Sequence, residues 1–224
     1  MNEEIKNILE KLKKPCHKIW YKQHYQYWEE CDPDIYKTSC YISDEGWIRD
    51  EYENEFIFQI INYNDEILPK EIKKLQLYWH ISNDNMNLVV TNKEEEEYLE
   101  PEKIENVHGV MYFEPSHNLP DWKTLEELHN AEFKIITSII EKENSKLKDY
   151  RFYEKYDEFV EEILGHENHY SFVGGNLNQM YHLMNTPSNE FKFIMQIETE
   201  CHMVYIFQNR DDNTQYRIEF ARYG

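Results

Sequence analysis

Two five-residue segments share the pattern F-I-x-Q-I, and each precedes a second run rich in aromatic and β-branched residues. The two copies are residues 56–60 and 193–197, and the runs that follow them are residues 75–81 and 203–207. Four identities in five positions arise by chance about one time in ten among all window pairs of such a chain, so the shared context supports the repeat. The pattern predicts a fold built from two related halves.

Composition indicates a folded and strongly acidic protein. The chain has 224 residues, enough for one large domain or two small ones, and 15% of them are aromatic. Its 44 acidic and 24 basic residues give a formal charge of −20. Such a charge repels phosphate backbones and anionic membranes and attracts cations. We therefore expect a basic protein partner and no binding to nucleic acid.

The cysteines and the hydropathy pattern favour a cytoplasmic protein. Cys16, Cys31, Cys40 and Cys201 form no C-x-x-C pair, and no apolar segment with a small-residue cleavage site precedes the first helical segment. The longest apolar stretches are a few residues, whereas about 20 are needed to span a bilayer. We expect free thiols, a cytoplasmic location and no membrane segment.

Apolar periodicity and capping signals predict three helices. The first ends at Pro15. The second and longest begins at a T-x-x-E capping box formed by Thr124 and Glu127. The third ends at Gly165, which occupies the C′ position that favours glycine. The expected ranges are residues 2–14, about 124–143 and about 153–164.

Runs of aromatic and β-branched residues predict the strands. Because the helical segment lies between two sets of strands and does not alternate with them, we expect an α+β fold with mainly antiparallel sheets. The expected unit is a single domain over residues 1–224, with halves at about 16–113 and 165–224, a helical insert at about 121–164 and a short N-terminal helix. The predicted strands are residues 56–63, 75–81, 87–91, 107–113, 191–197, 203–207 and 216–220.

Each copy of the repeat carries a glutamine beside an isoleucine on one face of its strand. In an extended chain Gln59 shares a face with Ile57, and Gln196 shares a face with Ile194. A buried amide without a hydrogen bond costs about 1–3 kcal/mol. Both glutamines are therefore expected to bond to neighbouring backbone, or to each other across a pseudo-twofold axis, in a structural role.

Catalytic and metal-binding patterns are weak in this chain. His166 and His169 have H-x-x-H spacing, and with His182 they are the candidate metal ligands. Gly165 predicts that the helix ends before them, so polar loop histidines are the simpler interpretation. Gly174-Gly175 lacks the further glycines of a phosphate loop, so a turn is expected there. We expect no cofactor and no enzymatic activity, with a metal-dependent hydrolase as the alternative.

Two segments combine features of a protein interface. Aromatic residues in the N-terminal part stand among acidic ones and offer large contact areas at low entropic cost. A run of glutamates is suited to a basic partner. Core packing for most of the aromatics, and a solvated loop for the glutamates, are the alternatives. The candidate contact residues are Trp20, Tyr25, Trp28, Glu94, Glu95, Glu96 and Glu97.

Several segments also share their pattern and order with one bacterial family. Residues 56–63, F-I-F-Q-I-I-N-Y, precede I-L-P at 67–69, and V-M-Y-F-E follows at 110–114. Residues 193–198, F-I-M-Q-I-E, begin the second half of the pattern. These segments resemble the L-A-Q-I-N-F, L-P, V-x-Y-Y-E and L-L-Q-I-D-S segments of the YwqG family, whose function is unknown.

The resemblance implies an α+β domain without an established activity. The chain departs from the family at the G-G-x-P turns, because residues 38–41 lack the turn and Gly174-Gly175 lacks the proline. Genes of this family sometimes lie near secreted-toxin systems. The resemblance thus implies an immunity or antitoxin role against a basic toxin, with a general protein-interaction module as a further alternative.

Overall fold

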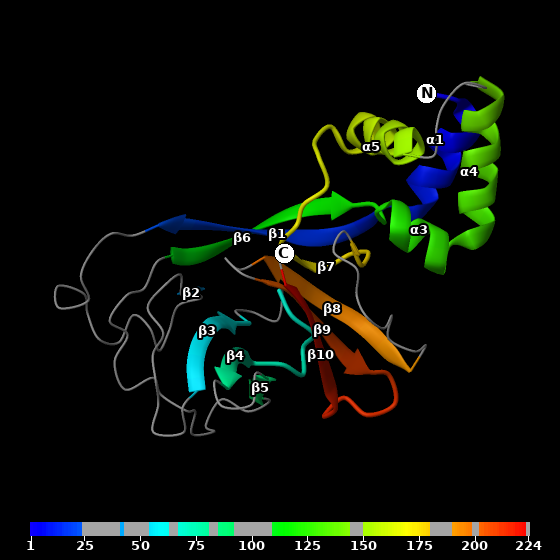
Figure 1. Ribbon diagram of the computed structural model, residues 1–224. Coiled ribbons are helices and arrows are strands. Elements are labelled where there is room, and N and C mark those ends of the chain that lie inside the picture. Colours follow the sequence, from blue (N-terminus) through cyan, green and yellow to red (C-terminus); the bar gives the residue numbers. More distant parts are fainter. Residues whose placement is uncertain are drawn as a thin grey trace.

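The computed structural model describes residues 1–23, 41–42, 54–62, 67–80, 85–91, 109–143, 150–179, 190–198 and 202–222 (Figure 1). Within them, ten strands form one hydrogen-bonded series in which every neighbouring pair is antiparallel. The α+β prediction is confirmed. The strands are β1 (Lys14–Gln23), β2 (Tyr41–Ile42), β3 (Asn54–Ile61), β4 (Lys74–His80), β5 (Asn85–Thr91), β6 (Gly109–Asn118), β7 (Phe172–Gly174), β8 (Phe191–Glu198), β9 (His202–Asn209) and β10 (Tyr216–Arg222).

The strand order is symmetric about its central pair, β1 and β6. It runs β10-β9-β8-β7-β1-β6-β2-β3-β4-β5, so the strands outward from β1 correspond to those outward from β6. The two F-I-x-Q-I copies occupy the equivalent strands β3 and β8. The register with the next strand shifts at the second residue of each copy, Ile57 in β3 and Ile194 in β8. A β-bulge at the same motif position supports the duplication.

The pseudo-twofold axis passes between Trp20 and Tyr112, which lie opposite each other in β1 and β6. In β1, Lys18 lies two residues before Trp20 and opposite Phe172 of β7. Phe172 in turn lies opposite the motif glutamine of β8, Gln196. In β6, Val110 likewise lies two residues before Tyr112 and opposite Tyr41 of β2. Tyr41 in turn lies opposite the motif glutamine of β3, Gln59. In space, therefore, β1 completes the half formed by β7–β10, although it lies at the start of the chain.

The two halves pack against each other over one core. Its buried residues come from both motif strands and their neighbours, including Ile60, Leu75, Met195 and Val204. The ends of the series approach each other, because Trp79 of β4 lies with its ring centroid 5.7 Å from that of Phe220 in β10. Burial of this shared apolar surface holds the halves together.

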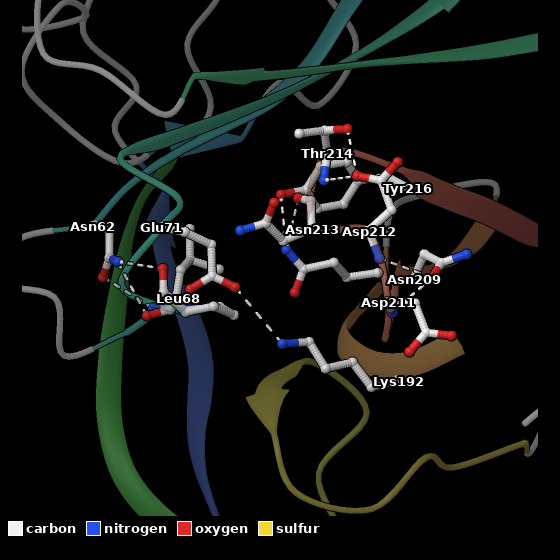
Figure 2. A network of polar contacts seen from close by, with 12 residues as sticks. Asn62, Leu68, Glu71, Lys192, Asn209, Asp211, Asp212, Asn213, Thr214 and Tyr216 are labelled. Atoms are coloured by element: carbon white, nitrogen blue, oxygen red, sulfur yellow. Dashed lines mark hydrogen bonds and ion pairs between the residues drawn. The ribbon is translucent and has the colours of Figure 1, made fainter. Parts of the chain in front are cut away.

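Polar contacts also join the halves at the rim of this core. The Lys192 ammonium in β8 lies 3.7 Å from the Glu71 carboxylate, which follows β3 in the other half (Figure 2). Asn62 holds Leu68, which lies between β3 and β4, by two hydrogen bonds. Its Oδ1 accepts from the Leu68 backbone N–H at 2.9 Å, and its Nδ2 donates to the Leu68 carbonyl at 3.0 Å (Figure 2). The Asn62 side chain thus pairs the buried backbone groups of Leu68, as a neighbouring strand would in a sheet.

Four helices in the described residues gather beyond one end of the β1–β6 pair and form a second core (Figure 1). Tyr156 is fully buried there and donates from its hydroxyl to the Pro120 carbonyl at 2.7 Å. Asn2 caps the first helix by accepting from the Glu4 backbone N–H at 2.9 Å. The helices are α1 (Glu3–Leu12), α3 (Trp122–Leu128), α4 (Asn130–Glu143) and α5 (Tyr150–Leu164).

The predicted capping box at Thr124 was wrong, and the predicted long helix is divided. Asp121 is the N-cap of α3, and its Oδ1 accepts from the Thr124 backbone N–H at 2.7 Å. The helix breaks at His129, so α3 and α4 are separate and the 15 residues of α5 make it longer than α4, which has 14. Gly165 ends α5 with φ 77°, as predicted, and its N–H donates to the Glu161 carbonyl at 2.8 Å.

A pair of asparagines ties the end of β6 to the segment that follows β7. Asn118 Oδ1 accepts from the Asn176 backbone N–H at 2.8 Å, and its Nδ2 donates to the Asn176 carbonyl at 2.8 Å. Gly175 lies directly against this pair with φ 76°. A Cβ added there would overlap the Asn118 side chain and lie 3.0 Å from the Cys16 Cβ. The glycine therefore meets two requirements, left-handed backbone and close approach.

Substituting Gly175→Ala should destabilise the protein by about 3 kcal/mol, because it adds left-handed strain and displaces the hydrogen bonds of Asn118. Gly165→Ala is the matched control, since Gly165 has φ 77° and open space around the added Cβ. The control should cost about 1 kcal/mol from backbone strain alone. Urea unfolding of both variants measures the difference, and equal losses would contradict the role of the close approach.

Candidate functional site

The strongest candidate site is a cavity of about 650 Å³ between α3, α5 and the segments that flank β7. Among the described residues that line it, four are carboxylates and Lys123 is the one cation. The Lys123 ammonium already lies 3.8 Å from the Glu127 carboxylate. The cavity therefore has an excess of negative charge. Its carboxylates belong to Asp121, Asp157, Glu161 and Glu167.

Helix geometry brings the acidic groups together. Asp157 and Glu161 lie four residues apart and so share one face of α5, where like charges repel. Asp121 lies at the start of α3, where its carboxylate also accepts from the Gln179 backbone N–H. Burial raises the pKa of the Asp121 carboxyl despite these hydrogen bonds. Desolvation, with the charges of Asp121 and Glu161, raises the pKa of Asp157 to about 6.

Two buried amide oxygens in the cavity wall have no hydrogen-bond partner in the described part of the chain. They are Asn178 Oδ1 and Gln179 Oε1, in residues that are only 2% and 1% exposed. Gln179 Nε2 donates to the Glu127 carboxylate at 2.9 Å, which sets the orientation of its amide. An unpaired buried acceptor costs about 1–3 kcal/mol, and native proteins contain few of them. A donor that reached these oxygens would remove this cost.

The repeat glutamine Gln196 forms hydrogen bonds to the backbone of two residues that line the cavity. It is fully buried, and its Oε1 accepts from the Asn178 backbone N–H at 3.0 Å. Its Nε2 donates to the Tyr170 carbonyl at 2.8 Å. The equivalent Gln59, also buried, accepts from Gln76 Nε2 at 2.8 Å inside the other half. The same motif residue thus supports the site in one half and the sheet in the other.

The histidines of the H-x-x-H segment are not among the residues that line the cavity. Their rings stack with centroids 4.4 Å apart, and their Nε2 atoms lie 3.4 Å (His166) and 2.9 Å (His169) from Ser116 Oγ. Between them in the chain, Asn168 pairs with both backbone groups of Leu119, and Asn168 lines the cavity. The segment from 165 to 170 therefore has histidines on one side and cavity residues on the other.

A metal centre at these histidines lacks further ligands in the part of the chain that the structure describes. His182, the third candidate, lies outside the described residues. No group of three or more His, Cys, Asp and Glu side chains able to hold a metal ion occurs among the described residues. Two stacked imidazoles and a serine do not complete the four-ligand shell typical of zinc.

Of the candidate contact residues, the structure describes Trp20. Its side chain is 44% exposed and stacks on Tyr112, itself 39% exposed, with ring centroids 4.6 Å apart. This stack marks the pseudo-twofold axis on the surface of the sheet. The other candidates, Tyr25, Trp28, Glu94, Glu95, Glu96 and Glu97, lie outside the described residues.

A second cavity, of about 520 Å³, lies between the halves and is lined mainly by apolar groups and backbone of β1, β6 and β8. Cys16 borders it, and burial raises the pKa of its thiol to about 11. The thiol therefore stays protonated at neutral pH and is a poor nucleophile. Among the described residues that line this cavity there is no carboxylate, and Lys192 is the charged one.

Comparisons with known proteins give no match that indicates a function. No protein-family model matches the chain, and a search of curated proteins gives no match. Among the described residues, no helix is both long enough and apolar enough to cross a bilayer. The cavity between α3 and α5 was not found from the sequence, where the available signal was the spacing of Asp157 and Glu161 on one helix face.

Protonation of His169 should destabilise the fold as the pH falls. Burial, with the nearby His166 and Lys18, lowers the pKa of His169 to about 4, against 6.5 for the free side chain. The unfolded chain thus binds the proton more readily, and the stability present above pH 6.5 is lost between pH 6.5 and 4. We expect a loss of about 1–2 kcal/mol after allowing for solvent screening.

The measurement is the difference in unfolding free energy between the wild type and His169→Gln at several pH values. Subtraction cancels the other titrating groups, so the wild-type advantage should shrink as the pH falls from 6.5 to 4. A difference that does not vary over this range would contradict the shifted pKa.

Asp157→Asn should stabilise the protein at pH 8. The folded-state pKa of Asp157 is raised from 3.8 to about 6, so its ionisation destabilises the fold as the pH rises through 6. Asn mimics the neutral carboxyl, and its advantage should be less than about 1 kcal/mol at pH 8, because the group is partly solvated, and vanish near pH 4. Glu158→Gln, next to it but paired with Lys155, is the control and should not stabilise. Thermal melts at both pH values test the contrast.

Proposed function

We propose that this protein is an acidic binding protein whose partner is basic, and that it acts as an immunity protein by neutralising a basic toxin. One observation carries the proposal: the described residues that line the cavity between α3 and α5 include four carboxylates and one lysine. Burial and the charges of Asp121 and Glu161 raise the pKa of the Asp157 carboxyl, and a cation that enters among these groups stabilises its ionised form. A basic partner supplies that cation.

The outer face of α5 extends the acidic surface beyond the cavity. Exposed acidic residues dominate this face, with Arg151 and Lys155 as the basic residues of the helix. A surface of one charge raises the rate at which an oppositely charged protein associates, and the effect falls with salt. Fast association suits a protein that must capture a toxin before the toxin acts. The exposed acidic residues of the helix are Glu154, Asp157, Glu158, Glu161 and Glu162, of which Asp157 and Glu161 also line the cavity.

The resemblance to the YwqG family and a cytoplasmic location belong to the same proposal. An immunity protein acts inside the cell that its toxin would damage, and free thiols such as that of Cys16 suit a reducing compartment. The exposed stack of Trp20 on Tyr112 offers a separate contact surface. Aromatic residues of this kind contribute strongly to protein interfaces.

The test is isothermal titration of the purified protein against the catalytically inactive product of the neighbouring gene, at low and high salt. We expect nanomolar binding that weakens at least about tenfold with added salt. The triple variant Glu154→Gln, Glu158→Gln, Glu161→Gln should slow association about tenfold. Glu3→Gln, Glu4→Gln, Glu10→Gln removes the same charge from α1 and should have a smaller effect. Absence of binding at both salt concentrations would refute the immunity pairing.

A further inference from the structure

We infer that the cavity between α3 and α5 receives the guanidinium group of a single arginine side chain of the partner. This inference rests on the proposed function, because it names the chemical group by which the basic partner is held. The lining residues and hydrogen-bonding groups of the cavity support it in addition to the charge.

The number of available acceptors favours a guanidinium. Among the residues that line the cavity, Asn178 and Gln179 each carry a buried, unpaired amide oxygen, and Asp121 and Asp157 add carboxylate oxygens. An arginine side chain carries five N–H donors in a fixed plane, whereas a lysine ammonium carries three. Several acceptors in one cavity suit a planar group that donates along several edges.

The remaining lining residues suit a flat cation on an aliphatic stem. Trp122, Tyr153 and Tyr170 bring aromatic rings to the cavity, and Val160 contributes an aliphatic surface. Tyr153 and Tyr170 are 44% and 38% exposed, so their rings are accessible to a ligand. Guanidinium groups stack on aromatic faces more readily than ammonium groups do. The cavity volume of about 650 Å³ is also sufficient for a long side chain.

The acceptors are held in place before any ligand binds. Gln196 holds the Asn178 backbone from the adjacent strand, and Glu127 holds the Gln179 amide. Acceptors fixed in this way lose little conformational entropy on binding, which increases affinity. A divalent cation fits the same surroundings less well, because the described residues contain no cluster of three or more acidic, histidine or cysteine side chains close enough to hold one.

The first experiment titrates the protein with N-acetyl-arginine amide, with the lysine equivalent and with the citrulline equivalent, which is a neutral isostere of arginine. We expect the arginine compound to bind with a Kd in the millimolar range or below, the lysine compound several-fold more weakly and the citrulline compound at least about tenfold more weakly. Equal binding of arginine and citrulline, or of arginine and lysine, would overturn the inference. So would displacement of the arginine compound by millimolar Ca²⁺ or Mg²⁺.

Variants of the cavity make the assignment specific. Asn178→Leu removes an unpaired oxygen, so it should weaken arginine binding at least about tenfold while leaving the fold as stable or more so. Asp157→Asn should also weaken binding about tenfold. Asp211→Asn, the same change on the exposed turn between β9 and β10 and outside the cavity lining, should change affinity by less than about twofold. Unchanged affinity in both cavity variants would refute the arginine site.

The same variants separate this inference from the proposed function. If the inactive toxin binds and both cavity variants bind it as tightly as the wild type, the arginine site is wrong and the binding function stands. If the arginine compound binds through the cavity and the toxin does not bind, the arginine site stands and the immunity pairing fails.

Discussion

The antiparallel pairing of β1 with β6 is the constraint on which the rest of the structure depends. This ladder joins ten residues from the start of the chain to ten from its middle. Each strand then provides the free edge on which one half is built, β7 on β1 and β2 on β6. At one end the ladder leads into α1 and towards α3, so it also positions the helical core (Figure 1). Without the ladder, the halves would share only their apolar faces and a few polar contacts at the rim.

Duplication explains how one half could acquire a site without loss of the fold. Gln59 and Gln196 occupy equivalent positions beside equivalent bulges, and both are buried. A buried amide must find partners, but any partners of suitable geometry are sufficient. In the first half the partner is Gln76 of the adjacent strand. In the second half the partners are backbone groups of Tyr170 and Asn178, which places two cavity segments at fixed positions against β8.

The predictable and unpredictable parts of the structure differ in the range of the interactions that determine them. The strands that contain the repeat were identified because alternating apolar residues and local turns specify them. β7 was not predicted, because three residues are too few to show an alternating pattern. It forms a strand by pairing with β1 and β8. Thr124 was misinterpreted as a cap because Asp121, three residues earlier, is an equally good one and is the residue used. The cavity was not foreseen, because it combines α3, α5 and the segments around β7, whose proximity depends on the β1–β6 pairing.

The energetics of the cavity argue that it is not merely a packing defect. Each unpaired amide oxygen costs about 1–3 kcal/mol, and burial, together with the like charges of Asp121 and Glu161, raises the pKa of Asp157 to about 6. Apolar side chains at these positions would avoid both costs. A cation with several N–H donors relieves both together, because it neutralises the carboxylates and pairs the amide oxygens. Binding of the cation and loss of the Asp157 proton are then one linked equilibrium, in which the unfavourable free energy of the empty cavity contributes to affinity.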